Sequence, residues 1–424
     1  MRIARKMVPG TSWVARGWDK EVARKAIGGL VSQAARMGIH MDHNPPITFA
    51  AAQALDVAKH LRSAGHQVIQ RYRIPSPALL VVVLPAYSSD LYQAVKHFGD
   101  ITVGVATQCL KGPIARAANE QYWANVCLKI NAKLGGVNSR LNPLDIPRWI
   151  FDPTCPTMII GSHLSGPSPG TSGRRPSFAA VVGSLDSNAV HYAATNSVQS
   201  SSIITINEFE NMVYELISRH ALWKKNREKQ TEIFPERIIY YHGGISDSEI
   251  SRVLNTELVA IQAACRRHKI NPKITIVIVV PGDGNHVRFF PTHGMADSSG
   301  NCPAGTVVDS VVGNPQEFDF YLQSHSSPMG TSCPSYYRVI HDENKFNQDS
   351  IQGLTYALCH LNARSTRSTS IPVPLHYAKL VSARARNHYD PSFLPRYGWG
   401  RQFAATGTGK SDKRSLRNWL QAGA

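Results

Sequence analysis

The sequence predicts an α/β protein in which strands and helices alternate along the chain. Two short runs, LLVVVL at 79–84 and ITIVIVV at 274–280, have strand length and contain no charged residue. Segments between such runs carry apolar residues at helical spacing. Because strands joined by helices are covered on both faces, these runs are typical of a largely parallel sheet between helical layers.

The first part of the chain is expected to form one α/β unit. Val22, Ala26 and Leu30 recur at helical spacing, and the apolar run at 79–84 ends at Pro85. A helix that carries Lys129 and Lys133 would close the unit. In order, we expect helices over 21–37 and 50–64, a strand over 79–84, a helix over 87–97 and a strand over 101–107.

Prolines at 143, 147, 153 and 156 mark the passage to a second α/β unit. Its expected strands cover 158–161, 177–186, 190–197, 237–242 and 274–280, with another beginning at 318–323. Helices are expected over 207–219 and most of 247–268.

Composition restricts the classes of function. The 424 residues carry a formal net charge of +17, which attracts polyanions such as nucleic acids. No two of the seven cysteines form a CxxC pair, so neither a disulfide framework nor a zinc cluster is indicated. The apolar runs are too short to cross a bilayer, so we expect no membrane association. We expect a reducing compartment: the cytoplasm, with the nucleus as a second location.

Lys129 and Lys133 are the most informative pair in the sequence. They lie four residues apart in NVCLKINAKLGGVN and therefore share one helix face among apolar neighbours. Two lysines in such surroundings repel each other and resist burial, and a bound anion would relieve both costs. The alternative is a partly solvated helix whose lysines extend to water.

Eight segments, in family order, resemble motifs of eukaryotic Argonautes, from about 87 to 388. The resemblance implies a Rossmann-like MID domain followed by a PIWI domain similar to RNase H. We expect a basic N-terminal lead over 1–24, MID over 25–141 and PIWI over 142–424. The segments are TQC at 107, NVCLKINAKLGGVN at 125, MIIG at 158 with PSPG at 167, PERIIYYHGG at 235, PAGTVVD at 303, EFDFYLQSH at 317, GTSCPSYYRV at 330 and STRSTSIPVP at 365.

The resemblance implies that the MID domain binds the 5′ phosphate of a small guide RNA. Several lysines and an arginine can neutralise such a phosphate through charge-assisted hydrogen bonds, and a tyrosine can stack on the first base. A Mg²⁺ ion at this phosphate is a further expectation. The matching residues are Tyr92, Lys96, Gln108, Lys129, Lys133 and, from the PIWI side, Arg384, with Arg364, Arg367 and Ser370 at guide-backbone positions.

The sequence departs from the family at the cutting centre. Slicing members hold two Mg²⁺ ions with carboxylates, and Mg²⁺ requires hard oxygen ligands. Here His163 and Gly243 occupy the two aspartate positions, and Lys379 occupies the position of the last ligand. The supporting glutamate position falls on Ile204, with Glu208 and Glu210 nearby. A lysine where a dication must bind costs several kcal/mol even at an effective dielectric near 20, so we expect neither a catalytic metal nor slicing.

Three functions compete at this stage. The first is a non-slicing binder of guide RNA that pairs with complementary target RNA and recruits silencing partner proteins. The second is a slicer with displaced ligands drawn from Asp186, Glu208, Glu210 and Asp247. The third is a degenerate paralogue that acts through protein interaction. Two alternatives stay open at the altered centre: His163 and His242 as a soft-metal pair, or Lys379 in contact with the target backbone in place of the metal.

Overall fold

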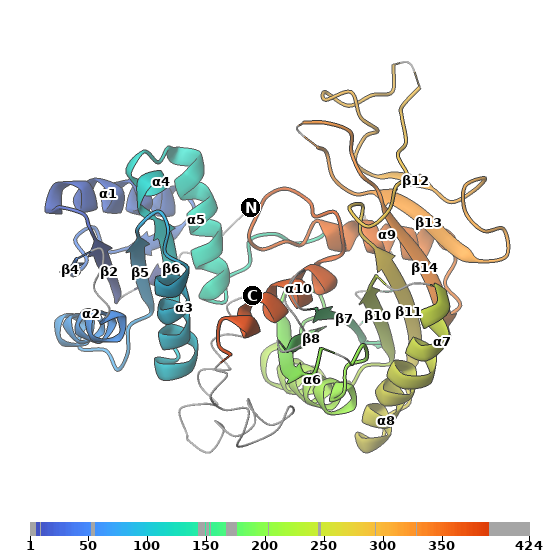
Figure 1. The fold of residues 1–424 in the computed structure, drawn as a ribbon. Helices are drawn as coiled ribbons and strands as arrows, with labels where there is room; N and C mark the ends of the chain where they lie inside the picture. The colour runs from blue at the N-terminus through green and yellow to red at the C-terminus, as the bar shows by residue number, and fades with distance from the viewer. Residues whose placement is uncertain are drawn as a thin grey trace.

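The chain folds into two α/β units, each built on its own sheet (Figure 1). The structure, a computed structural model, describes residues 6–8, 10–51, 56–142, 149, 152, 154–166, 176–201, 203–244, 247–292, 294–327 and 329–389. The PSPG motif and the residues after 389 lie outside these ranges. Among the described helices, none is both long and apolar enough to cross a membrane.

The first unit is a four-stranded parallel sheet with strand order β4-β2-β5-β6. Alternate residues of β5 enter two different cores: Leu79, Val81 and Val83 pack toward α1 and α5, whereas Leu80 and Val82 pack toward α2 and α3. Burial on both faces explains the uninterrupted apolar run. The elements are β2 Thr11–Arg16, α1 Lys20–Arg36, β4 Ile47–Ala50, α2 Val57–Tyr72, β5 Leu79–Leu84, α3 Ser89–His97, β6 Ala106–Lys111, α4 Gly112–Arg116 and α5 Glu120–Lys133, with β1 Lys6–Val8 paired to β3 Ile39–Met41.

Three expectations for this unit are wrong. Strand β2 lies inside the sheet and α1 spans residue 24, so residues 11–24 are not a separate lead. The helix expected over 50–64 begins only at Val57, because Ala50 still pairs with β2. The strand expected over 101–107 begins only at Ala106, because residues 98–103 continue α3 as a π-helix. Gly99 in this helix packs against Thr107, where a Cβ would lie 2.5 Å from Thr107 Cγ2.

The second unit is an eight-stranded mixed sheet with order β12-β13-β14-β11-β10-β7-β8-β9. Its centre, β7-β10-β11, is parallel and its flanks are antiparallel. The expected strand pair after residue 177 is confirmed as β8 and β9. The strands are β7 Thr157–Ser165, β8 Ser177–Ser184, β9 Tyr192–Gln199, β10 Arg237–Gly243, β11 Lys273–Val280, β12 Thr306–Val308, β13 Phe318–Gln323 and β14 Ser335–Asp342.

Helix α10 places functional candidates across the second sheet. It packs over β7 and β8, and its C-terminal end points toward the first unit (Figure 1). Gly161 permits this contact, because a Cβ there would lie 2.4 Å from the Pro374 carbonyl carbon. The helices are α6 Phe209–Trp223, the π-helix Lys224–Glu228, the 3-10 turn Asp247–Glu249, α7 Ile250–Val253, the π-helix Leu254–Leu258, α8 Val259–Arg267, α9 Gln348–Cys359 and α10 Val373–Arg386.

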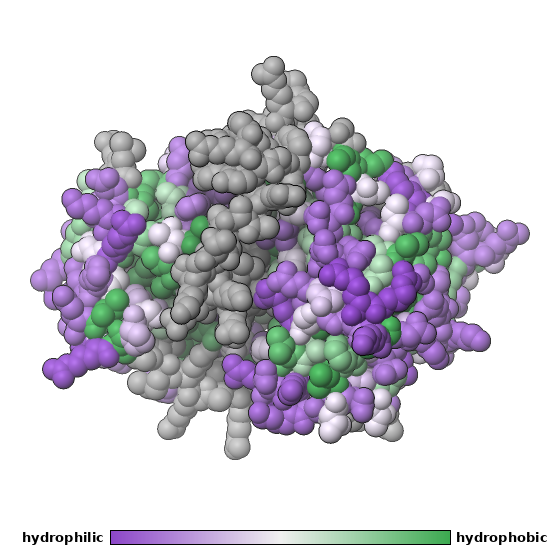
Figure 2. Space-filling view, turned by 90° about the horizontal axis from the view of Figure 1, so that it is seen from below, coloured by the Kyte–Doolittle hydropathy of each residue, from purple (hydrophilic) through white to green (hydrophobic). Residues whose placement is uncertain are grey.

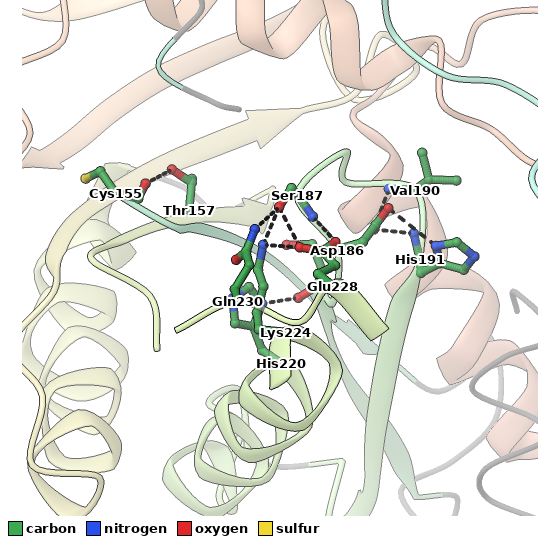
Figure 3. Close-up of polar contacts among 11 residues, drawn as sticks. Cys155, Thr157, Asp186, Ser187, Val190, His191, His220, Lys224, Glu228 and Gln230 are labelled. Carbon is green, nitrogen blue, oxygen red and sulfur yellow. Dashed lines mark hydrogen bonds and ion pairs between the residues drawn. The ribbon is translucent and has the colours of Figure 1, made fainter. Parts of the chain in front are cut away.

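A buried polar cluster holds the β8–β9 turn against the end of α6 (Figure 3). The Lys224 ammonium, 1% exposed, donates to Ser187 Oγ at 2.6 Å and to Glu228 Oε2 at 3.0 Å. His220 lies beside it, with Nδ1 2.8 Å from the Ser184 carbonyl oxygen. Because the lysine is paired and hydrogen-bonded, its burial is accounted for structurally without a ligand.

The molecular surface is predominantly polar on the face drawn in Figure 2. Hydrophilic residues cover most of its coloured area, and apolar residues form small separate groups between them. With a net charge of +17 for the whole sequence, the long-range field favours anionic partners.

Candidate RNA-binding pocket and the altered catalytic centre

A cavity of about 480 Å³ lies where the two units meet, lined by residues of α3, β6, α5 and α10. All six residues predicted to bind the guide 5′ phosphate line it: Tyr92, Lys96, Gln108, Lys129, Lys133 and Arg384. Arg364, predicted at a backbone position, lines it too. The pocket therefore brings together residues, predicted from the sequence, that lie up to 292 positions apart in the chain.

The start of β6 fixes two of the lysines. Lys96 Nζ donates to the Thr107 carbonyl oxygen at 2.8 Å and to Thr107 Oγ1 at 2.9 Å. Lys133 Nζ reaches the same carbonyl at 2.9 Å and Gln108 Oε1 at 2.7 Å. Two ammonium groups from α3 and α5 thus share one acceptor. The Thr107 carbonyl is a positioning group that the sequence analysis did not single out.

The pocket is strongly cationic. Burial lowers the pKa of Lys96, Lys129 and Lys133, and for Lys133 the neighbouring charge of Lys96 lowers it further, to well below the usual lysine range. Burial and the charge of Arg384 also contribute to a lowered pKa for Arg364. Depressed pKa values of this origin mean that each positive charge is held at a cost. A bound anion would remove that cost.

Arg384 and Tyr92 complete the pocket. The Arg384 guanidinium carbon lies 5.8 Å from the Tyr92 ring centroid, and Lys96 Nζ lies 5.6 Å from the same centroid. The half-buried tyrosine ring is therefore within cation–π distance of both the arginine and a buried lysine. An aromatic face in this position can stack on a base while the cations bind its phosphate.

Two other predicted guide contacts lie apart from the cavity lining. Arg367 is exposed, and Ser370 is half-buried with its carbonyl oxygen accepting from Ser335 Oγ at 2.6 Å. Their role toward a guide backbone stays a prediction. Within the part of the chain that the structure describes, Asp100 is the one carboxylate in the lining, and it faces Arg384. That carboxylate is already paired with the Arg384 guanidinium, and the expected Mg²⁺ ion at the guide phosphate stays a prediction.

The structure also brings together the three altered catalytic positions. β7 and β10 are parallel with Ser162 opposite His242, so His163 and Gly243 follow side by side. Lys379 and Ser382 come from α10, and Ser382 Oγ lies 2.8 Å from His163 Nδ1. Burial, then the charges of Lys379 and His242, lowers the pKa of His163 to about 4. These side chains do not fit Mg²⁺, which binds oxygen ligands and is repelled by an ammonium.

His242 is directed toward a buried carboxylate. Its Nε2 lies 3.5 Å from Glu257 Oε2, which also accepts from Tyr240 Oη at 2.5 Å. Tyr240 Oη is in turn 2.5 Å from Ser162 Oγ. This chain of contacts links the ends of β7 and β10 to the π-helix Leu254–Leu258. Within the described ranges, no group of three or more His, Cys, Asp or Glu side chains is arranged as a metal site.

Three of the acids considered as displaced ligands are engaged in other contacts. Asp186 Oδ1 accepts from the amides of Val190 and His191, Glu208 accepts from Asn211 at 2.9 Å, and Glu210 pairs with Arg267 at 3.0 Å. In β8 the residue opposite His163 is Ala180, whereas Asp186 lies beyond the end of that strand.

A four-stranded parallel unit joined to an RNase H-like mixed sheet, with a cationic pocket between them, defines a MID–PIWI lobe. The Piwi domain family model matches residues 79–390, most of the chain. The chain therefore belongs to the Piwi domain family, and its fold is that of solved MID-PIWI lobes. This confirms the expected fold class: a Rossmann-like MID domain followed by an RNase H-like PIWI domain.

Solved structures share the fold at low sequence identity. Kluyveromyces polysporus Argonaute, solved with a guide RNA, matches with a TM-score of 0.80 and 22% identity over 93% of this chain and 48% of its own. Drosophila Piwi matches at 0.69 and 19% over 90% and 50%. The MID-PIWI domains of Neurospora crassa (N. crassa) QDE-2 match at 0.59 and 20% over 100% and 95%. The chain thus spans about half the length of the first two proteins.

Proposed function

We propose that this chain binds the 5′-phosphorylated end of a small guide RNA and presents the guide for pairing with target RNA in RNA silencing. The observation that carries the proposal is the convergence of Lys96, Lys129, Lys133 and Arg384 on one interdomain cavity. The fold shared with an Argonaute solved with a guide RNA supports it.

The chemistry of the pocket suits a terminal phosphate. Such a group carries nearly two negative charges at neutral pH and offers several strong acceptor oxygens. Lys96 and Lys133 now donate to a neutral carbonyl, so an anionic acceptor would strengthen their bonds and restore their pKa values. Tyr92 would stack on the first base, a contact worth about 1–3 kcal/mol for any base.

Specificity for a target would come from base pairing and not from the protein. Sequence-independent contacts to the guide backbone set affinity and register without reading bases. The exposed Arg367 is available for such a contact, and Arg364 lies at the pocket wall from which the guide would continue. Silencing partner proteins are part of the proposal as the means by which a bound target is repressed.

The proposal excludes slicing for an electrostatic reason. Where metal-binding carboxylates would stand, the chain has an imidazole with a pKa of about 4, a glycine and a lysine. Burial lowers the pKa of Lys379, and Asp283 opposes that shift. In this proposal the half-buried Lys379 contacts the target backbone directly, in place of a metal ion. A slicer with displaced ligands is disfavoured because Asp186 and Glu210 are engaged away from this centre.

The direct test compares binding of 5′-phosphorylated and 5′-hydroxyl short RNA of one sequence. We expect the phosphorylated RNA to bind more tightly, and Lys129→Ala and Lys133→Ala to weaken it about 10- to 100-fold each, the range for a lost charge-assisted bond. Lys59→Ala is the matched control, since Lys59 is an exposed lysine on α2.

Equal affinity for the two RNAs, unchanged by either pocket substitution, would rule out the proposal. Retained binding of silencing proteins in that case would favour the third function, a paralogue that acts through protein contacts.

A further inference from the structure

Among the described residues that line the cationic pocket, Asp100 is the single carboxylate. It belongs to the π-helix Phe98–Val103, which continues directly from α3. Gly99 lets this turn lie against β6, because a Cβ would be 2.5 Å from Thr107 Cγ2 and 2.9 Å from the Val105 carbonyl oxygen. π-Helical turns are frequent at functional sites, and this one brings an acid to the wall that faces the other domain.

The partners of Asp100 come from the PIWI domain. Its Oδ2 atom lies 3.1 Å from His388 Nε2 and 3.6 Å from Arg384 Nη1, at and just beyond the end of α10. The three side chains are 13%, 6% and 18% exposed, respectively. Burial alone would raise the pKa of Asp100, but the His388 hydrogen bond and the Arg384 charge outweigh it and lower the pKa. The carboxylate is therefore ionised at neutral pH.

Arg384 is held by this ion pair while keeping a donor available. Its Nη1 atom is buried and makes no hydrogen bond to the described part of the chain. An arginine loses considerable rotamer freedom when it is fixed, and fixing it before the ligand arrives removes that loss from binding. The ion pair also spans two domains, so the same contact sets where α10 lies relative to β6.

We propose that Asp100 is a positioning residue that holds the PIWI arginine Arg384 in the MID phosphate pocket, with His388 as its second contact. The inference rests on the proposed function. Charge alone predicts the opposite effect, because the Asp100 carboxylate would repel a bound phosphate. If Asp100 acted only through its charge, Asp100→Asn would tighten phosphate binding. If Asp100 positions Arg384, the same substitution weakens it.

A double-mutant cycle distinguishes the two. We expect Asp100→Asn to weaken binding of 5′-phosphorylated RNA about 10-fold, the effect of one well-placed charged contact, and to leave 5′-hydroxyl RNA unchanged. In an Arg384→Ala background, Asp100→Asn should cause no further loss of binding, since the residue it positions is gone. Asp90→Asn, an exposed acid on α3, controls for the lost negative charge.

Unchanged or tighter phosphate binding by Asp100→Asn, or a full additional loss in the Arg384→Ala background, would overturn the inference. If Asp100→Asn does not fold, His388→Gln tests the same contact while keeping the charges of Asp100 and Arg384. This substitution should weaken phosphate binding by a smaller factor. No loss of binding would also overturn the inference. If the unmodified chain does not discriminate the two RNAs, the proposed function itself fails. Discrimination that is insensitive to both substitutions refutes only the role of Asp100.

Discussion

The Lys133→Met substitution tests whether Lys133 strengthens RNA binding while lowering the stability of the RNA-free chain. The substitution keeps much of the side-chain volume and removes a buried ammonium whose pKa burial and Lys96 lower to well below the usual lysine range. It deletes two hydrogen bonds, at 2.9 Å to the Thr107 carbonyl and 2.7 Å to Gln108 Oε1. Thr107 keeps its bond to Lys96, so one acceptor remains satisfied.

The magnitude follows from the role of the ammonium. A charge-assisted bond to phosphate contributes about 1.5–3 kcal/mol, which is about 10- to 100-fold in affinity for 5′-phosphorylated RNA. Because the charge is desolvated and faces other cations, removing it should leave the melting temperature of the RNA-free chain unchanged or higher. The assay is fluorescence anisotropy with both RNAs, together with thermal unfolding without RNA.

The result that refutes this reasoning is an equal loss of affinity for 5′-hydroxyl and 5′-phosphorylated RNA together with a lower melting temperature. Lys133 would then be a structural lysine that holds β6 to α5. Lys59→Ala, measured in parallel, shows how much of any change comes from net charge alone.

Three further predictions concern other parts of the chain. Gly161→Ala should lower the melting temperature through overpacking of about 1–3 kcal/mol, because its Cβ would be 2.4 Å from the Pro374 carbonyl carbon; Gly28→Ala, with nothing within 4 Å, should not. Burial lowers the folded pKa of His220 to about 4 from 6.5, so the unfolded chain alone takes up a proton between these pH values. Stability should therefore fall by about 3 kcal/mol as pH drops through that window, and unfolding of His220→Gln should show a shallower pH dependence. Arg367→Ala should lower the affinity for 5′-phosphorylated and 5′-hydroxyl RNA equally, and it should reduce the slope of log affinity against log salt concentration by about 0.7. The loss expected at Lys133, in contrast, is specific to the phosphorylated RNA.

The sequence predicted the parts of the fold that local pattern determines. The β5 run is apolar at every position because it enters two cores, and its bounds were predicted without error. Strand β2 was not predicted, since TSWVAR shows no regular alternation of polar and apolar residues and lies in a basic stretch. Only its pairing with β5 reveals it. The β-branched residues of ITV predicted a strand where the structure has a π-helix, and the close packing of Gly99 against Thr107 is a tertiary contact that the local pattern does not show.

The pocket was predictable in its residues but not in its internal contacts. Family motifs indicated the lysines, Tyr92 and Arg384, all of which line one cavity. The role of Asp100 was not predicted, because its partners lie 284 and 288 positions away in another domain. The one local signal was an acid four residues after Lys96, at the spacing of an ion pair within a helix. Such a pattern is common on solvated helices, so only the structure distinguishes this acid.

The central claim is that this chain holds a guide RNA by its 5′ phosphate and leaves the paired target intact. The most direct test loads the 424-residue chain with a 5′-phosphorylated guide and adds a fully complementary labelled target in Mg²⁺. We predict that the target is retained at full length and that retention is lost with a 5′-hydroxyl guide. Cleavage of the target opposite the guide, or retention that ignores the phosphate, would contradict the account.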